Sequence, residues 1–481
     1  MFLFVLRLIS FLLAIVAFTF VLPVLCGLWY GEIQTVFCFI IPFVVCMLIA
    51  AVMWFVGKSQ KTKQLSSRGG YILVAIAWIM TCFLGAVPLF LSGTMESFTD
   101  VFFESVSGFS TTGATVLSDV ESLPHCINFW RMQMHWLGGM GIIVLTVALL
   151  PLLGVGGFQL IKAETTGPDK GKITPKIATT AKILWFIYFG MTLLETFLLV
   201  LCGMPFWDAL AHSFSTLGTG GFSSKNSSIG FYNSPSIEWI CCIFMLLSGI
   251  NFSLYFLIIT GKIKEVFKNT ELKAYLLLLF ASIAIVSVVI LPQYKDLLTS
   301  IRLAAFQVVT IVTTTGFATA DFTNWVSPAQ FIIFLLMFVG GCSGSTGGGF
   351  KVIRWVVLGK QASNEIRHIL HPHGVFTIRI NNEPGRKDLV FSVAAFGFLY
   401  AVLVFLTTFV STFGGLDLIS AFTAALSMVG NIGPGFGLVG PSENYGFLVP
   451  FVKWWYCFAM LAGRLELYTL ILFFFPTFWK K

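Results

Sequence analysis

Charged residues are scarce in this chain: of 481 residues only 29 are Lys or Arg and 21 are Asp or Glu, or 10% together. A typical soluble protein carries about 25% charged residues. Hydrophobic residues make up 57% of the sequence and the mean hydropathy is +0.91, so most of the chain must lie in lipid. The composition excludes a soluble globular fold and predicts an all-α polytopic membrane protein.

Metal-binding and catalytic signatures are also missing. None of the ten cysteines belongs to a CxxC pair, so their spacing indicates neither a zinc site nor a disulfide framework. The apolar segments contain no GxSxG with a histidine, no aspartyl pair and no HExxH, which leaves a polytopic membrane enzyme as a remote alternative. His135 and His212 are expected at the edges of spans or turns, as interfacial side chains rather than catalysts. No cofactor is expected on this chain.

Apolar segments of about 20 residues, the length that crosses roughly 30 Å of hydrocarbon, occur ten times. The first is longer than the apolar core of a signal peptide and has no small-x-small cleavage site, so it is expected to remain as a span. The ten predicted spans lie near residues 4–26, 37–57, 71–91, 132–152, 183–203, 237–260, 274–291, 328–359, 389–411 and 451–476.

The net charge of +8 could indicate nucleic-acid binding, but the positions of the basic residues argue against it. Most of them fall in alternate loops, at 58–68, 162–182, 262–273 and 351–387, and at the C-terminus. The positive-inside rule therefore predicts that these loops and both termini are cytoplasmic. The basicity reflects membrane topology, and no nucleic-acid partner is expected.

Four loops between the spans share a segment rich in Ser, Thr and Gly. In each copy a glycine follows Thr or Asn by two positions and Ser or Thr by six. Asp100 and Asp208 lie thirteen residues before their glycines and Asp417 sixteen before, and each is expected to cap a short helix, whereas the third copy has no acid at that spacing. Each copy reads as a span, a half-helix, a turn and a span. The copies are FFESVSGFSTTGAT (102–115), LAHSFSTLGTGGFS (210–223), QVVTIVTTTGFAT (307–319) and AFTAALSMVGNIGPGFG (421–437).

Four such turns around one axis predict a pore, because non-helical backbone at membrane depth is tolerated only inside protein or beside a water-filled cavity. Backbone carbonyls can replace the hydration shell of K⁺, and half-helix C-termini add partial negative charge. Glycine at Gly113, Gly221, Gly316 and Gly433 permits backbone conformations closed to other residues. Nearby hydroxyl groups can tie each turn to its half-helix. Such a pore needs no ring of acidic side chains.

These motifs resemble the membrane subunits of bacterial Trk potassium-uptake systems, the TrkH/TrkG family of the Trk/Ktr/HKT superfamily, over essentially the whole chain. The resemblance implies two N-terminal helices and four helix, pore-loop, helix repeats in a pseudo-fourfold arrangement around one ion pore. It also implies one filter glycine per repeat, and glycine at the first position is typical of the potassium-selective members. The implied K⁺-binding residues are Thr111, Thr112, Gly113, Thr219, Gly220, Gly221, Thr314, Thr315, Gly316, Asn431, Ile432 and Gly433.

The resemblance divides the chain into two N-terminal helices (1–70), pore repeat 1 (71–152) and pore repeat 2 with a cytoplasmic linker (153–260). Pore repeat 3 (261–359), a second cytoplasmic linker (360–388) and pore repeat 4 (389–481) follow. The expected function is uptake of K⁺ across the bacterial cytoplasmic membrane. Passage of sodium or of any monovalent cation is the alternative.

Span 8 contains a glycine-rich stretch, VGGCSGSTGGGFKVIR at 339–354. Each interior glycine costs about 1 kcal/mol in a helix, so a continuous helix is not expected. The stretch lacks the Gly-Lys-Ser/Thr of a phosphate loop, and close helix packing through small residues is the alternative to a flexible loop. The family places an intramembrane gating loop here, at 340–350. The implied gate residues are Gly340, Gly341, Gly344, Gly347, Gly348, Gly349 and Arg464.

Arg464 lies within the last predicted span, where a cation must face protein or a cavity. One possibility is a purely structural pair with Glu195. The other is a positive charge beside the ion path that acts with the loop, and the resemblance favours it because the family carries Arg at the matching position.

The cytoplasmic segment 362–388 carries His368, His371 and His373, whose HxxHxH spacing could bind metal, but Pro372 interrupts the helix and no fourth ligand is near. A basic docking surface is the favoured interpretation. The resemblance implies a homodimer above a cytoplasmic TrkA-like subunit that binds NAD(H) and ATP and docks on this segment and on 154–182.

Overall fold

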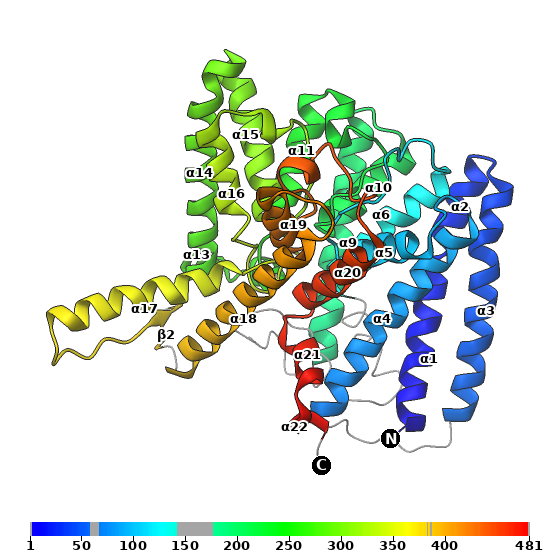
Figure 1. Ribbon diagram of the computed structural model, residues 1–481, viewed down its shortest axis with the longest axis horizontal. Helices are drawn as coiled ribbons and strands as arrows, with labels where there is room; N and C mark the ends of the chain where they lie inside the picture. Colours follow the sequence, from blue (N-terminus) through cyan, green and yellow to red (C-terminus); the bar gives the residue numbers. More distant parts are fainter. Residues whose placement is uncertain (1, 58–66, 142–176, 382, 385–386, 480–481) are drawn as a thin grey trace.

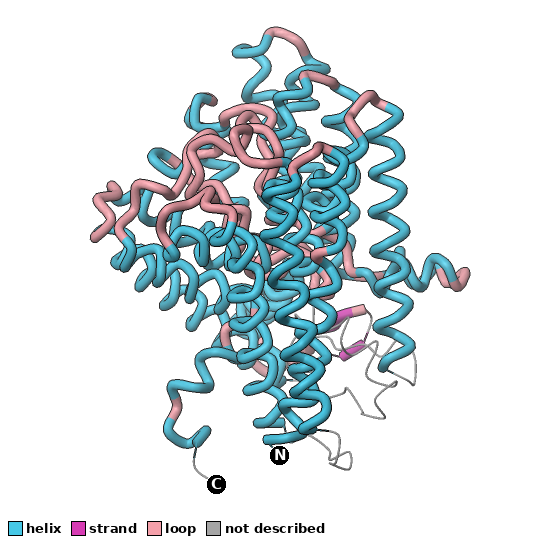
Figure 2. Tube along the Cα trace, turned by 90° about the vertical axis from the view of Figure 1, so that its right-hand side faces the viewer, coloured by secondary structure: helices cyan, strands magenta, loops and turns pink. Residues whose placement is uncertain are grey.

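The computed structural model describes residues 2–57, 67–141, 177–381, 383–384 and 387–479. Helices account for nearly all of the regular structure, and the described strands form one short hairpin of β1 (Arg379–Ile380) and β2 (Glu383–Pro384) (Figure 2). The N-terminal part consists of α1 (Phe2–Thr19), α2 (Val21–Trp29) and α3 (Ile33–Gly57). There α1 packs along α3 and α4 at one flank of the molecule (Figure 1).

The remaining chain repeats one pattern four times, which confirms the predicted fold class. A long apolar helix leads to a half-helix, a turn segment and a second helix, and the half-helices gather in the middle of the molecule (Figure 1). The long helices are α4 (Ser67–Leu91), α9 (Ile177–Leu201), α14 (Thr270–Tyr294) and α18 (Lys387–Thr412). The half-helices are α5 (Phe98–Phe109), α10 (Phe206–Leu217), α15 (Leu297–Val312) and α19 (Leu418–Gly430).

The second helix is broken in repeats 2 and 4, which corrects the prediction of continuous spans there, whereas in repeat 3 it is interrupted as expected and in repeat 1 the predicted span 132–152 lies partly outside the described residues. In repeat 2 the chain bends by 93° between α11 (Pro235–Ser248) and α12 (Phe252–Ile259), and in repeat 4 by 116° after α20 (Pro450–Arg464). Within the described part, six helices are long and apolar enough to cross a membrane, or eight if each bent pair is one span. The other second-helix elements are α6 (His125–Gly139), α16 (Ser327–Leu336) with α17 (Val352–Leu370), and α21 (Tyr468–Ile471).

Two of the three predicted half-helix caps are wrong. Ser97 caps α5 by accepting from the Thr99 amide, while Asp100 lies in the first turn. Pro205 precedes α10, and Asp208 again lies in its first turn. An acid in the first turn still interacts favourably with the positive end of the helix dipole. An acidic residue near each helix start was therefore expected correctly, although the position of the helix start was not.

The caps of the other two half-helices are acidic. Asp417 caps α19 as predicted, accepting from the amides of Ile419 and Ser420. The third copy does have an acidic cap, Asp296 on α15, which accepts from the Thr299 amide. It was missed because α15 is longer than the other half-helices.

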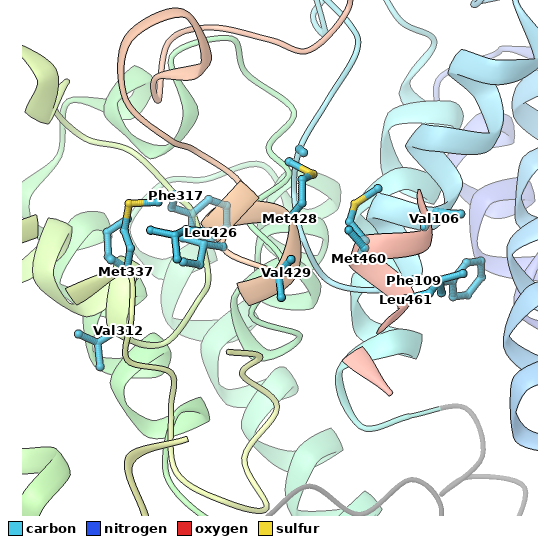
Figure 3. Close-up of a cluster of buried hydrophobic side chains, with 14 of the residues drawn as sticks. Val106, Phe109, Val312, Phe317, Met337, Leu426, Met428, Val429, Met460 and Leu461 are labelled. Carbon is cyan, nitrogen blue, oxygen red and sulfur yellow. The ribbon is translucent and has the colours of Figure 1, made fainter. Parts of the chain in front are cut away.

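Half-helices pack against the second helix of a neighbouring repeat: α10 lies on α6, α15 on α11 and α5 on α20. The last contact joins repeat 4 to repeat 1 and closes the arrangement. Apolar side chains fill the space between these elements (Figure 3). They include Val106 and Phe109 of α5, Val312 of α15, Leu426, Met428 and Val429 of α19, and Met460 and Leu461 of α20.

The helix α17 and several short elements complete the described chain. The helix α17 extends away from the body, with His368, His371 and His373 exposed at and beyond its end (Figure 1). No group of three metal-ligating side chains gathers anywhere in the part of the chain that the structure describes. The remaining elements are α13 (Ile263–Lys268), α22 (Pro476–Trp479), η2 (Ser228–Tyr232), η3 (Phe322–Asn324), η4 (Gly437–Val439) and η5 (Leu472–Phe474).

Candidate ion-conduction site

All four half-helices end in the same way. The residue two before each repeat glycine adopts the left-handed conformation, with φ of 57° at Thr111, 52° at Thr219, 58° at Thr314 and 54° at Asn431. The next amide then donates to a carbonyl five residues earlier, at distances of 2.8–3.0 Å. This bond pattern is the Schellman ending of a helix. The pairs are Thr112 to Ser107, Gly220 to Ser215, Thr315 to Thr310 and Ile432 to Ser427.

The left-handed conformation is unusual for these residues. Thr is β-branched, and a β-branched residue with positive φ is a steric outlier that costs about 1–3 kcal/mol. Three of the four copies place Thr there, fully buried, so the surrounding structure must hold the strain. Strain repeated at equivalent positions points to a functional constraint on the turn segments 111–113, 219–221, 314–316 and 431–433.

The four repeat glycines form a closed ring in which each glycine contacts the next repeat. This ring is called here the glycine ring (Gly113, Gly221, Gly316 and Gly433). Each has positive φ, between 76° and 99°. A Cβ added to any of them would collide with a carbonyl oxygen of the next repeat. Gly113 faces the carbonyl of Gly220, Gly221 that of Thr315, Gly316 that of Ile432, and Gly433 that of Thr112 at 2.7 Å.

The cyclic order of these contacts has two consequences. Repeats 1, 2, 3 and 4 meet in sequence and repeat 4 returns to repeat 1, so the turn segments surround one axis. In addition, only glycine fits at these positions, because a side chain would push the neighbouring carbonyl aside. All four glycines also line one cavity of about 130 Å³.

Two carbonyl groups in each turn segment, those of the residues before the repeat glycine, have no hydrogen-bond donor in the described part of the chain. Among the described residues, none donates to the carbonyl oxygens predicted to line the ion path. Most of these residues are fully buried, and a buried carbonyl without a partner is rare in proteins. The C-termini of four half-helices add partial negative charge at the same place. The oxygens belong to Thr111, Thr112, Thr219, Gly220, Thr314, Thr315, Asn431 and Ile432.

His135 supports one turn segment inside the protein, so its predicted interfacial location is wrong. Its ring is fully buried. Nδ1 donates to the Gly108 carbonyl at 2.8 Å, and Nε2 accepts from the Phe222 amide at 3.2 Å. His212 is also fully buried, with Nε2 2.9 Å from the Ser223 hydroxyl. Isolated histidines carry no sequence signal for such a role.

The charged side chains near the cavity pair with one another inside the protein. Arg131, which lines the cavity, is buried and binds the Glu104 carboxylate at 2.5 Å. Its guanidinium also stacks 4.2 Å above the Phe222 ring. Lys453 binds Asp100 at 2.5 Å. These carboxylates are neutralised by partners, so they do not form an acidic ring around the glycines.

The glycine-rich segment 340–350 is a loop, as predicted, and lies outside any helix, which excludes simple helix packing. Its two ends are fastened together, since the Gly340 amide donates to the Phe350 carbonyl at 2.9 Å. The middle contacts the turn segments: the Gly348 amide donates to the Thr314 hydroxyl at 2.7 Å. A Cβ at Gly348 would lie 2.6 Å from the Gly430 carbonyl oxygen, so glycine permits this close approach.

The other predicted gate glycines lie in the same loop. Gly341 accepts from the Val352 amide at 3.3 Å, and Gly344 accepts from the Phe252 amide at 3.0 Å. Gly347 would place a Cβ 2.8 Å from the Thr313 carbonyl oxygen. Gly349 has φ of 70°. The loop therefore lies at the end of the turn segments opposite the cavity.

Arg464 binds this loop directly. Its Nη1 donates to the Thr346 carbonyl at 2.7 Å, and its Nη2 donates to the Gly138 and Gly139 carbonyls at the end of α6. The suggested pair with Glu195 is wrong, because neither oxygen of that carboxylate has a partner among the described residues. The guanidinium thus joins the loop to repeat 1.

Two further charged residues hold the loop and were missed in the sequence. Lys351 is buried and its Nζ donates to the Gly347 carbonyl, although its sequence position indicated an ordinary cytoplasmic cation. Glu271 is buried and accepts from the amides of Ser343 at 2.6 Å and Ile353 at 3.2 Å. The Glu271 contacts join residues more than 70 positions apart, and the Lys351 bond spans four residues in a segment with no helical periodicity, so the sequence pattern gives no signal for either.

Asn431 connects the loop region with the turn segments. Its Nδ2 donates to the Thr112 hydroxyl at 2.9 Å and to the Met460 carbonyl at 3.0 Å. A Cβ at Gly348 would lie 3.0 Å from its Oδ1. The one side chain therefore contacts repeat 1, α20 and the loop.

Pseudo-fourfold half-helices, a closed glycine ring and unpaired carbonyls define the class: a multi-pass membrane transport protein for cations. The chain belongs to the TrkH family, described as cation transport protein, whose model matches residues 36–481. This membership confirms the resemblance and excludes the membrane enzyme.

Named relatives cover nearly the whole chain. It is 38% identical to the Trk system potassium uptake protein TrkH of Escherichia coli (strain K12) over 480 residues, 99% of each chain. It is 36% identical to TrkG of that organism, covering 98% of this chain and 97% of the relative. The crystal structure of the potassium transporter TrkH from Vibrio parahaemolyticus superposes with a TM-score of 0.87 at 35% identity over 100% of both chains.

Proposed function

We propose that this chain takes up K⁺ through a selectivity filter formed by the turn segments. The observation that carries the proposal is the closed order of glycine contacts, which brings four sets of unpaired carbonyl oxygens around one axis. Carbonyl oxygens can replace the water that K⁺ loses on entry. The relatives named as potassium uptake proteins support K⁺ as the ion.

A neutral filter suits rapid passage. Full negative charges at the filter would bind a cation tightly, whereas carbonyl dipoles and helix termini attract it without holding it. A membrane potential of 100 mV favours entry of one charge by about 2.3 kcal/mol, or roughly fiftyfold accumulation. Inward movement therefore needs no catalytic machinery on this chain.

The loop 340–350 acts as the gate in this proposal. It lies against Thr314 and Asn431, the first residues of two turn segments, so it obstructs the path below the filter. Arg464 and Lys351 fasten it through the carbonyls of Thr346 and Gly347, and their positive charges oppose a cation there. Opening the gate requires these bonds to break.

The partner assignments rest on the family resemblance and on charge. The protein is proposed to form a homodimer in the bacterial inner membrane with both termini in the cytoplasm. A TrkA-like subunit that binds NAD(H) and ATP would dock on residues 362–388. The second proposed docking segment, 154–182, lies largely outside the described residues.

Tracer flux tests the function. Liposomes that contain the purified protein take up rubidium tracer in the presence of competing K⁺, Na⁺ or choline. Uptake is measured with and without the soluble partner. Strong competition by K⁺ and weak competition by Na⁺ are expected. Equal competition by both ions would instead support the alternative of unselective cation passage.

A further inference from the structure

The carbonyl oxygen of Gly433 is already occupied. It accepts from the Ser427 hydroxyl at 2.6 Å and from the Tyr445 hydroxyl at 2.8 Å. A carbonyl oxygen has two lone pairs, and two hydroxyl donors at these distances engage both. This oxygen has little left to offer a cation, although Gly433 belongs to the glycine ring.

The other three glycines of the ring differ. Within the described residues, nothing donates to the carbonyls of Gly113, Gly221 or Gly316. The hydroxyls equivalent to Ser427 have no hydrogen-bond partner there either. These are Ser107, Ser215 and Thr310, all buried. The residues twelve positions after the three glycines, where Tyr445 stands in repeat 4, are His125, Asn233 and Pro328.

Tyr445 is held firmly in place. It is 3% exposed, and its amide donates to the Thr115 carbonyl of repeat 1 at 2.8 Å. Its ring lies 6.2 Å from that of Phe103 and 6.1 Å from that of Tyr456. The tyrosine thus spans from repeat 1 to the carbonyl of repeat 4, and its burial and its amide bond position the hydroxyl beside Gly433.

We propose that Tyr445 and Ser427 withhold the Gly433 carbonyl from the ion, so that the glycine level of the filter offers K⁺ three carbonyl oxygens instead of four. Tyr445 is a positioning residue, since it acts through the Gly433 carbonyl. The inference rests on the proposed K⁺ filter. One missing ligand weakens binding at this level, which faces the cavity, and a weaker site releases its ion more readily to the next one.

Removing the Tyr445 hydroxyl tests this inference. Tyr445→Phe frees one lone pair of the Gly433 oxygen while keeping the ring. Tyr456→Phe is the matched control, because Tyr456 is an equally buried neighbour whose hydroxyl contacts Ser411 at 2.7 Å and does not touch the filter. Rubidium uptake into liposomes gives the half-saturating ion concentration and the maximal rate for each variant.

In Tyr445→Phe the half-saturating concentration should fall at least ~2-fold, which corresponds to about 0.5 kcal/mol, the lower end of a hydrogen bond's contribution. Tyr456→Phe should leave it unchanged. A value that is unchanged or higher in Tyr445→Phe would overturn the inference, because a purely structural hydroxyl would alter stability and leave ion affinity alone.

A second measurement avoids dependence on flux. Ser427→Ala removes the other donor, and the increase in melting temperature produced by K⁺ over choline reports ion binding to the folded protein. That increase should be larger in Ser427→Ala than in the unmodified protein, and an equal or smaller increase counts against the inference. If K⁺ fails to compete with rubidium in the unmodified protein, the proposed function falls as well. If K⁺ competes normally with rubidium and both variants behave like the unmodified protein, only this inference is contradicted.

Discussion

The imidazole ring of His135 occupies the space where a side chain at Gly220 would lie. The equivalent positions in the other repeats hold Thr112, Thr315 and Ile432, so repeat 2 is the only copy with glycine immediately before its ring glycine. Since His135 bonds to both Gly108 and Phe222, its ring cannot move aside without breaking those bonds. The two residues form a complementary pair across repeats 1 and 2.

Gly220→Ala should therefore reduce rubidium flux by about tenfold or more, because overpacking a dense interior costs about 1–3 kcal/mol and would displace the turn. Gly190→Ala is the control, since a Cβ there meets nothing within 4 Å. Flux and melting temperature of both variants provide the comparison. Equal flux in the two variants would show that the His135–Gly220 contact does not shape the ion path.

Gly113→Ser should relax the preference for K⁺ over Na⁺ by about tenfold, equivalent to roughly 1.4 kcal/mol. The added Cβ would strike the Gly220 carbonyl and move an ion ligand. Gly93→Ser makes a fair control, because Gly93 also has positive φ, 65°, but lies in open space. Relative permeability in proteoliposomes is the measurement. A ratio that does not change would contradict the filter assignment.

Arg464→Ala should raise basal flux in the absence of the soluble partner by about tenfold or more. The variant removes hydrogen bonds from a charged group to the Thr346, Gly138 and Gly139 carbonyls, each of which contributes about 1.5–3 kcal/mol. Arg464→Lys should give an intermediate rate, because a single ammonium cannot span both segments. Basal flux at or below the unmodified level in the alanine variant would argue against a fastening role.

Shortening the loop by deleting Gly347–Gly349 should also raise basal flux. The deletion removes the carbonyl that Lys351 binds and the amide that contacts Thr314. Uptake measured without the partner gives the basal rate. If the rate is unaltered or lower, the loop is not the gate.

The repeat architecture could be predicted because its signal is local and occurs four times. Aligning four glycines was enough to identify Thr111, Thr219, Thr314 and Asn431 as equivalent, and all four share one backbone conformation. The half-helix starts were less predictable, since α15 is longer and is capped by Asp296, which lies outside the common spacing.

Contacts distant in sequence could not be predicted. The break after Arg464 has no proline, and the guanidinium of Arg464 binds carbonyls more than 100 positions away. Lys351 and Tyr445 bind carbonyls only four and twelve positions away, but those bonds form in irregular segments where no periodic pattern reveals them. One sequence shows which positions repeat but does not show which distant side chain contacts each of them.

The most direct test of the central claim is competition for rubidium uptake into liposomes that contain the purified protein alone. If the unpaired carbonyls of the turn segments form a potassium filter, excess K⁺ should abolish tracer uptake while equal concentrations of Na⁺ or choline leave most of it. Equal inhibition by Na⁺ and K⁺, or uptake no faster than in empty liposomes, would contradict the account.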